Sequence, residues 1–180
     1  DRTVSDSSTV RNAAVGYYGL ASRRHCQILG ERTKCVLNAH IWPDHNKSNL
    51  VLVDLKPSDI DNPKNILRLH CGIERYFDHK QLTFTQAGAA FHLKVLDPNI
   101  KTEVLEGTNV ALNDVDGSPL IFPNDHVPWR RLLATHSIIA HRHARNNGWL
   151  PEDELTTAEL NANDLIVFSL DAEAQARVKR

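Results

Sequence analysis

The stretch 26–85 constrains the fold most, because strand patterns and a helical pattern follow one another there in a set order. The short apolar runs 26–29 and 35–41 flank a turn-like Gly-Glu-Arg-Thr-Lys segment, which predicts a β-hairpin. The second strand of this hairpin carries His40 near its end, and Pro43 stops it. A loop is expected over 44–64, with one further strand at 49–55. From Asn65 to about Asp78 the apolar residues recur at helical spacing, so a helix is predicted to begin at Asn65.

The remainder of the chain adds elements of both kinds, which places it in the α+β class. These elements are a helix over 10–24, a hairpin of 81–85 and 89–96 around Gly88, a β element over 103–122 with an Asp116-Gly117 turn, and a long helix from Pro128 to Gly148. The 180 residues are 41% hydrophobic, which suffices for one core, and no apolar run approaches the length of a membrane span.

The near-neutral charge of the chain hides an uneven distribution. Lys and Arg number 21 against 22 Asp and Glu, but residues 151–180 alone hold seven acids and three bases. Residues 1–150 therefore carry 18 bases and 15 acids. A mildly basic body with an acidic tail is compatible with nucleic-acid binding of modest, salt-sensitive strength.

The three cysteines predict neither a zinc ribbon nor a disulfide framework, since they form no Cys-x-x-Cys pair and their number is odd. Cys26 and Cys35 are expected to lie in the hairpin as small apolar residues. Histidine is abundant, with ten copies, and this side chain serves both catalysis and metal binding.

Three residues of the stretch 26–85 have the chemistry of a phosphodiesterase site. A strand-borne imidazole, His40, can take a proton from water, and an amide, Asn65, can hold that imidazole in one orientation. A helix carboxylate, Glu74, can help to hold a hard divalent cation. Each residue also has a structural interpretation. His40 would be an ordinary polar residue, Asn65 a helix N-cap, and Glu74 an exposed acid paired with Arg75 or Lys80.

Residues 26–43 and 65–84 resemble the HNH endonuclease domain. The resemblance rests on Ala39-His40-Ile41-Trp42-Pro43, Asn65-Ile66-Leu67-Arg68-Leu69, Phe77-Asp78 and Leu82-Thr83-Phe84, which are similar to the subgroup with an A-H-I-x-P strand end. A fainter likeness to fungal and oomycete members lies in the following β region and in the helix that contains Pro128, Leu132 and His136. The Gly-Ile-Glu-x-x-Phe-Asp form of the helix over 72–78 also resembles the HNH-like domains of some Crinkler-type effectors. The resemblance implies a ββα-metal core over 25–96, preceded by a helical extension over 1–24. The pattern of the remaining residues predicts a β and helix elaboration over 97–150 that packs on this core, and an acidic tail over 151–180.

The resemblance implies His40 as general base, Asn65 as its positioner and Glu74 as a ligand of one Mg²⁺ or Mn²⁺ ion. Two departures stand out: the last His of the family falls on Glu74, and Ala39 occupies a position that is acidic in many relatives. His70, one helical turn before Glu74, is the second candidate ligand. Asp44, His45 and Asp78 are further candidates.

The long helix over 128–147 supplies the candidate contacts to a phosphate backbone, namely Arg130, Arg131, Arg142 and Arg145. The structural alternative is a solvated basic face. A zinc site built from His136 and His143 is not favoured, because no further ligand stands at the right spacing.

Together these residues predict a metal-dependent endonuclease of low sequence specificity, acting on DNA more readily than on RNA and not on a membrane. It would act inside a cell or nucleus, or as a secreted effector in another cell. The alternative is a degenerate HNH fold that binds nucleic acid or protein without cleaving it. The departures at Ala39 and Glu74 motivate this alternative.

Overall fold

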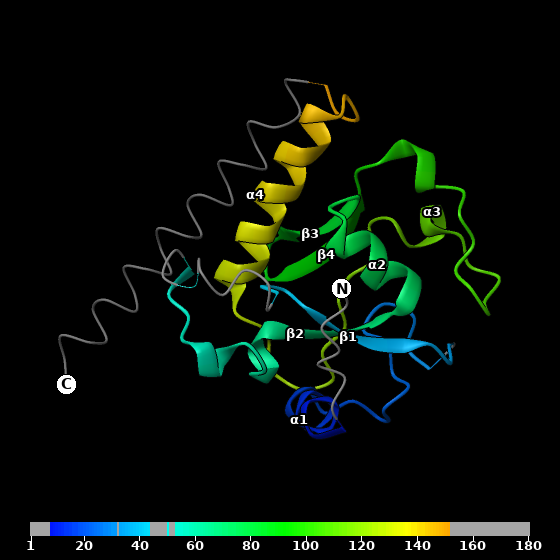
Figure 1. Ribbon diagram of the computed structural model, residues 1–180. Coiled ribbons are helices and arrows are strands. Elements are labelled where there is room, and N and C mark those ends of the chain that lie inside the picture. Colours follow the sequence, from blue (N-terminus) through cyan, green and yellow to red (C-terminus); the bar gives the residue numbers. More distant parts are fainter. Residues whose placement is uncertain (1–7, 32, 44–49, 51–52, 152–180) are drawn as a thin grey trace.

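The computed structural model describes residues 8–31, 33–43, 50 and 53–151 (Figure 1). Its helices and its two small, separate sheets confirm the α+β class. The main elements are α1 (Ser8–Tyr18), β1 (Val36–His40), β2 (Ile66–His70), α2 (Cys71–Asp78), β3 (Leu82–Ala87), β4 (Ala90–Val95), α3 (Leu112–Val115) and α4 (Arg130–Asn146). The 3₁₀ turns whose bounds are described are η2 (Pro57–Asp59), η3 (Pro63–Asn65) and η4 (Pro98–Ile100). No helix in the described part of the chain is long and apolar enough to cross a membrane.

The central ribbon pairs β1 with β2, so the predicted hairpin of 26–29 with 35–41 is wrong. The two strands are antiparallel, with His40 opposite Ile66 and Val36 opposite His70. Gln27 lies along β2 instead: its N–H donates to the Arg68 carbonyl, and its side-chain oxygen accepts from the Arg68 N–H, at 2.9 and 2.8 Å. Sequence proximity favours the short hairpin, but β1 instead pairs with β2, every residue of which is buried.

β2 also corrects the helix expected from Asn65 onward, because its five residues are a strand and the helix begins only at Cys71. Each residue of β2 is buried. Arg68 and His70 are buried together with the leucines of this strand, and a segment of five residues is too short for periodicity alone to distinguish a buried strand from part of a helix. The C-terminal half of the predicted helix is α2.

The disulfide Cys35–Cys71 links the two strands at one end of this ribbon, the end opposite His40, with the Cα atoms 5.6 Å apart. The N–H of Cys71 also donates to the Cys35 carbonyl at 3.1 Å. The expectations of no disulfide and of an apolar role for Cys35 were therefore wrong, since the pairing of β1 with β2 brings together two cysteines that are 36 residues apart. Cys26 is free and buried, as expected for a small apolar residue.

The hairpin of β3 and β4 is confirmed, and it turns through Gly88 with φ 61°. The β element expected over 103–122 is wrong. Within it, only isolated bridges join Val104 to Ala111 and Pro119 to His92, and residues 112–115 form α3. The Asp114 carboxylate accepts from the Ala111 N–H at 2.9 Å, which favours this short helix over a strand. Of the strand expected at 49–55, the described residues form helical turns and no strand.

Two helices flank the sheets. α4 matches the predicted long helix, packs against β3 and ends before Gly148, whose φ is 70°. α1 is shorter than expected, because the chain leaves the helix at Gly19 with φ 63°. It packs against β2 and η3, where the buried Tyr18 hydroxyl contacts the carbonyls of Pro63 and Ile66 at 2.8 and 2.9 Å.

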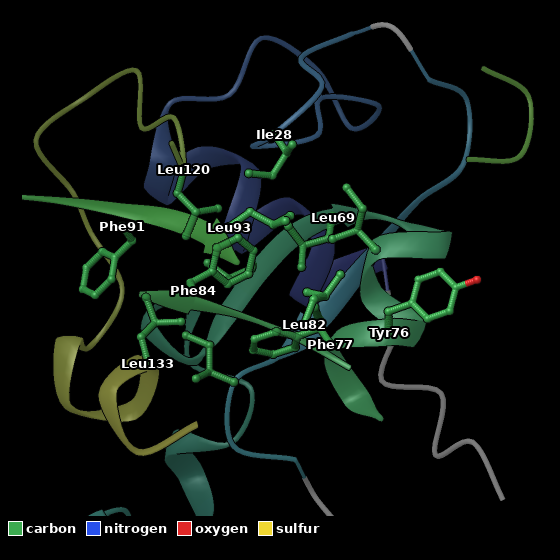
Figure 2. Packing of buried hydrophobic residues seen from close by; sticks show 14 of the residues in the cluster. Ile28, Leu69, Tyr76, Phe77, Leu82, Phe84, Phe91, Leu93, Leu120 and Leu133 are labelled. Carbon is green, nitrogen blue, oxygen red and sulfur yellow. The ribbon is translucent and has the colours of Figure 1, made fainter. Parts of the chain in front are cut away.

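One main hydrophobic cluster runs from Cys26 to Leu133 and joins the segments 25–96 and 97–150 (Figure 2). In Figure 2 the side chains of Phe77, Phe84 and Leu133 meet between α2, the second sheet and α4. The β1–β2 ribbon lies between this cluster and α1, which explains why β2 is buried throughout.

Candidate functional site

His40 lies at the end of β1, where its side chain is 13% exposed. Its Nε2 atom is 3.2 Å from Oδ1 of Asp61, a residue whose side chain is 54% exposed. An ionised carboxylate only accepts hydrogen bonds, so Nε2 is the donor in this contact. The strand end therefore places a partly exposed imidazole beside an exposed carboxylate.

Asn65 is fully buried, and its side chain bonds to the backbone close to each member of this pair, after His40 and before Asp61. Its Oδ1 accepts from the Trp42 N–H at 2.8 Å, and its Nδ2 donates to the carbonyls of Trp42 and Ile60, each at 2.9 Å. Trp42 follows His40 by two residues, and Ile60 directly precedes Asp61. Asn65 is thus not the N-cap of a helix, and its side-chain bonds go to backbone groups around His40.

Glu74 is half-buried in the first turn of α2. This helix buries Ile73 and Phe77 in the cluster that also holds Ala39 and Leu67. Because side chains alternate along a strand, His40 leaves β1 on the opposite face, which it shares with Asn38.

The described part of the chain contains no group of three His, Cys, Asp or Glu side chains that could hold a metal ion. The candidate ligands Asp44 and His45 lie outside the described residues. Asp78 is exposed at the last residue of α2. Glu74 thus keeps the chemistry of a hard-metal ligand, but the described residues do not form a complete coordination set around it.

His70 is buried, and both of its ring nitrogens are engaged. Nδ1 accepts from the Gly72 N–H at 3.0 Å and so caps α2, while Nε2 donates to the Glu106 carbonyl at 3.0 Å. Burial lowers the pKa of His70, which favours its neutral form. This geometry assigns His70 to helix capping and does not favour it as a metal ligand, a role that sequence spacing could not distinguish from capping.

The four arginines of α4 do not share one environment. Arg130 and Arg142 are exposed, and Arg145 is half-buried. Arg131 is buried, and its guanidinium donates to the carbonyls of Val53 and Asp54 at 3.1 and 3.2 Å. The expectation of a phosphate contact at Arg131 is therefore corrected: this side chain holds the segment 53–54 against α4.

Sequence patterns missed two residues at the ribbon. Asp61 lies in a segment without periodicity, and no local signal connects it to His40, 21 residues earlier. Arg68 is completely buried, and its guanidinium donates to Asn38 Oδ1 and to the Arg23 carbonyl, each at 2.6 Å. In the sequence, the signal for this buried polar contact was Arg68 itself, a basic residue within the otherwise apolar run 66–69.

Comparison with known proteins agrees with the ribbon and helix just described. Residues 26–85, about one third of the chain, match the model of a family described as HNH endonuclease. No curated protein and no solved structure matches the chain significantly. The match confirms the HNH resemblance for the segment that contains β1, β2 and α2, while the finer subgroup and the Crinkler likeness stay predictions.

Proposed function

Because residues 26–85 carry an HNH endonuclease domain, we propose that this protein hydrolyses phosphodiester bonds in nucleic acid, in DNA more readily than in RNA. We propose little sequence preference, because the described part of the chain offers scattered cations for phosphates and no element placed to read bases. The observation that carries this proposal is His40 at an accessible strand end, with the backbone around it held by the buried Asn65.

In the proposed reaction His40 takes a proton from a water molecule as the water oxygen attacks phosphorus. Asn65 contributes by holding the chain at Trp42 and Ile60, which limits the movement of the strand end and keeps the imidazole in place. The exposed Arg130 and Arg142 are proposed to contact phosphates outside the scissile bond.

We also propose one divalent ion, Mg²⁺ or Mn²⁺, with Glu74 as a ligand. Such an ion would neutralise negative charge on the reacting phosphate. The described residues do not complete a coordination set for this ion.

Replacement of His40 tests the proposal. His40→Ala is expected to lower the nicking rate of supercoiled plasmid by at least about 100-fold in Mg²⁺ or Mn²⁺, because the general base is lost. The thermal midpoint should stay nearly unchanged, since the side chain lies at an edge of the ribbon. His143→Ala, at an exposed position of α4, is the matched control and should cleave at the wild-type rate. Undiminished cleavage by His40→Ala would contradict the proposed role.

The second candidate is a degenerate HNH fold that binds nucleic acid or protein without cleavage. It is favoured by Ala39 and Glu74 at the two departures from the family pattern, and by the incomplete coordination set in the described part of the chain. This candidate predicts salt-dependent binding of plasmid by the wild-type protein with no nicking in any divalent metal.

A further inference from the structure

We propose that Asp61 is a positioning residue for His40, orienting the imidazole and determining which ring nitrogen takes the proton. This inference rests on the proposed nuclease function for its kinetic consequence. The contact on which it is built is independent of that function.

The contact between the two side chains has a defined direction. Oδ1 of Asp61 is 3.2 Å from Nε2 of His40, and the ionised carboxylate has no proton to donate. The proton of the neutral imidazole therefore lies on Nε2, and the lone pair lies on Nδ1. A base that is oriented through its second nitrogen by a carboxylate is a recurring arrangement in enzymes that activate an oxygen nucleophile.

The segment that carries Asp61 is held so that this side chain reaches His40. Its polar neighbours make local caps: Oδ2 of Asp59 accepts from the Lys56 N–H at 2.9 Å, and Oδ1 of Asn62 accepts from the Lys64 N–H at 3.0 Å. The adjacent Ile60 is buried in the main cluster. Asp61, between these anchors, instead contacts a residue 21 positions earlier.

Asn65 connects the two partners. Its side-chain amide bonds to Trp42 beyond His40 and to Ile60 before Asp61, and its main-chain carbonyl accepts from the Ile41 N–H at 2.8 Å. A single buried side chain thus sets the distance between the strand end and the Asp61 segment. Asn65 acts on the imidazole through the backbone, and Asp61 acts on it directly.

In the proposed step, the bond between the water oxygen and phosphorus forms as the bond from phosphorus to the leaving oxygen breaks. The water proton passes to Nδ1 of His40, and the leaving oxygen takes a proton from solvent. The Asp61 carboxylate faces the imidazolium that forms and stabilises its charge. Because Asp61 is largely exposed, we expect its orienting effect to outweigh its Coulomb attraction.

The kinetic test compares Asp61→Ala, Asp61→Glu and Asp59→Ala on the full chain. Asp61→Ala should lower kcat for plasmid nicking by about 10- to 100-fold with KM nearly unchanged, because the base is misplaced while substrate contacts persist. Asp61→Glu should recover part of the rate, since a carboxylate is restored. Asp59→Ala removes a cap in the same segment and should leave kcat unchanged. An undiminished kcat in Asp61→Ala, alongside loss of activity in His40→Ala, would overturn the role of Asp61 and leave the proposed function intact.

A readout independent of activity is the long-range ¹H–¹⁵N spectrum of the His40 ring at neutral pH. The wild-type ring should show a proton on Nε2 and none on Nδ1, and Asp61→Ala should raise the fraction protonated on Nδ1. Identical ring spectra in the two proteins would overturn the proposal. If the wild-type protein cleaves no nucleic acid, the proposed function fails, and this spectrum still decides whether Asp61 orients His40.

Discussion

His136 stacks on Phe77 with the ring centroids 3.7 Å apart, and its nitrogens bond to Thr83 Oγ1 and to the Phe77 carbonyl at 2.9 and 3.1 Å. Burial, together with the nearby charge of Lys80, lowers the pKa of His136 to about 3. His40, at the edge of the ribbon, has a carboxylate partner and access to solvent. At the scale of residues, the surroundings of each imidazole decide between a role in packing and a role in chemistry.

The pKa of His136 predicts a loss of stability in mild acid. Between the ordinary value of 6.5 and about 3, the unfolded chain binds a proton that the folded protein excludes. The contribution of this residue to stability is therefore complete above pH 6.5 and is lost as the pH falls toward 3. The slope should not exceed about 1.4 kcal/mol per pH unit. Urea unfolding at pH 7, 6 and 5 measures it.

His136→Gln provides the control for this pH dependence, because the amide can keep a hydrogen bond to the Phe77 carbonyl but does not titrate in this range. The variant should be less stable at pH 7 and should lose less stability on acidification. A pH dependence equal to that of the wild-type protein would contradict the assignment to His136.

At the scale of elements, the junction of β2 and α2 organises the HNH segment. His70 is the last residue of the strand and the N-cap of the helix, so the chain changes from one structure to the other at a single side chain. At the other end of α2, main-chain bonds close the last turn: the N–H groups of Lys80 and Gln81 donate to the carbonyls of Phe77 and Tyr76. Lys80 takes the left-handed conformation there, with φ 60°. These two ends fix the length of the helix that carries Glu74.

This junction predicts different effects for its two candidate metal ligands. His70→Ala should lower the free energy of unfolding by about 1 to 2 kcal/mol through loss of the cap, and His70→Asn should restore part of it. If α2 contributes to a metal site through Glu74, the increase in thermal midpoint with Mn²⁺ should persist in His70→Asn and vanish in Glu74→Ala. The opposite pattern of metal response would show that His70 is the ligand.

At the scale of the whole molecule, one core joins segments that are distant in the chain. Arg131 of α4 holds the carbonyls of Val53 and Asp54, and α1 packs on the outer face of the β1–β2 ribbon. The Cys35–Cys71 disulfide closes the loop that contains most of the candidate site. A covalent closure of this length restricts the unfolded chain and so favours the folded protein.

Removal of the disulfide should therefore destabilise the protein. The variant with both Cys35→Ser and Cys71→Ser is expected to lose roughly 3 to 4 kcal/mol of unfolding free energy relative to the oxidised wild-type protein, measured in urea. Under a thiol reductant the difference between the two proteins should largely disappear. A wild-type protein whose stability does not respond to reductant would contradict a stabilising disulfide.

The extent to which sequence predicted this protein follows from the range of each interaction. The β3–β4 hairpin and α4 were predictable, because alternation, a turn glycine and helix-end signals lie within the elements themselves. The position of His40 at a strand end was predictable for the same reason. The partner of β1, the strand β2 and the disulfide were not, because each depends on which distant segments meet.

The amino-acid sequence by itself determined the α+β class, the HNH segment and the identities of its imidazole, amide and carboxylate. Only the tertiary structure decided what those groups contact: Asp61 beside His40, Asn65 bonded to backbone groups, and His70 and Arg131 engaged in packing. The physical reason is that the chemistry of a side chain and the local spacing of apolar residues are properties of the sequence itself. Burial and hydrogen-bond partners, in contrast, arise between segments tens of residues apart that come together only when the core forms.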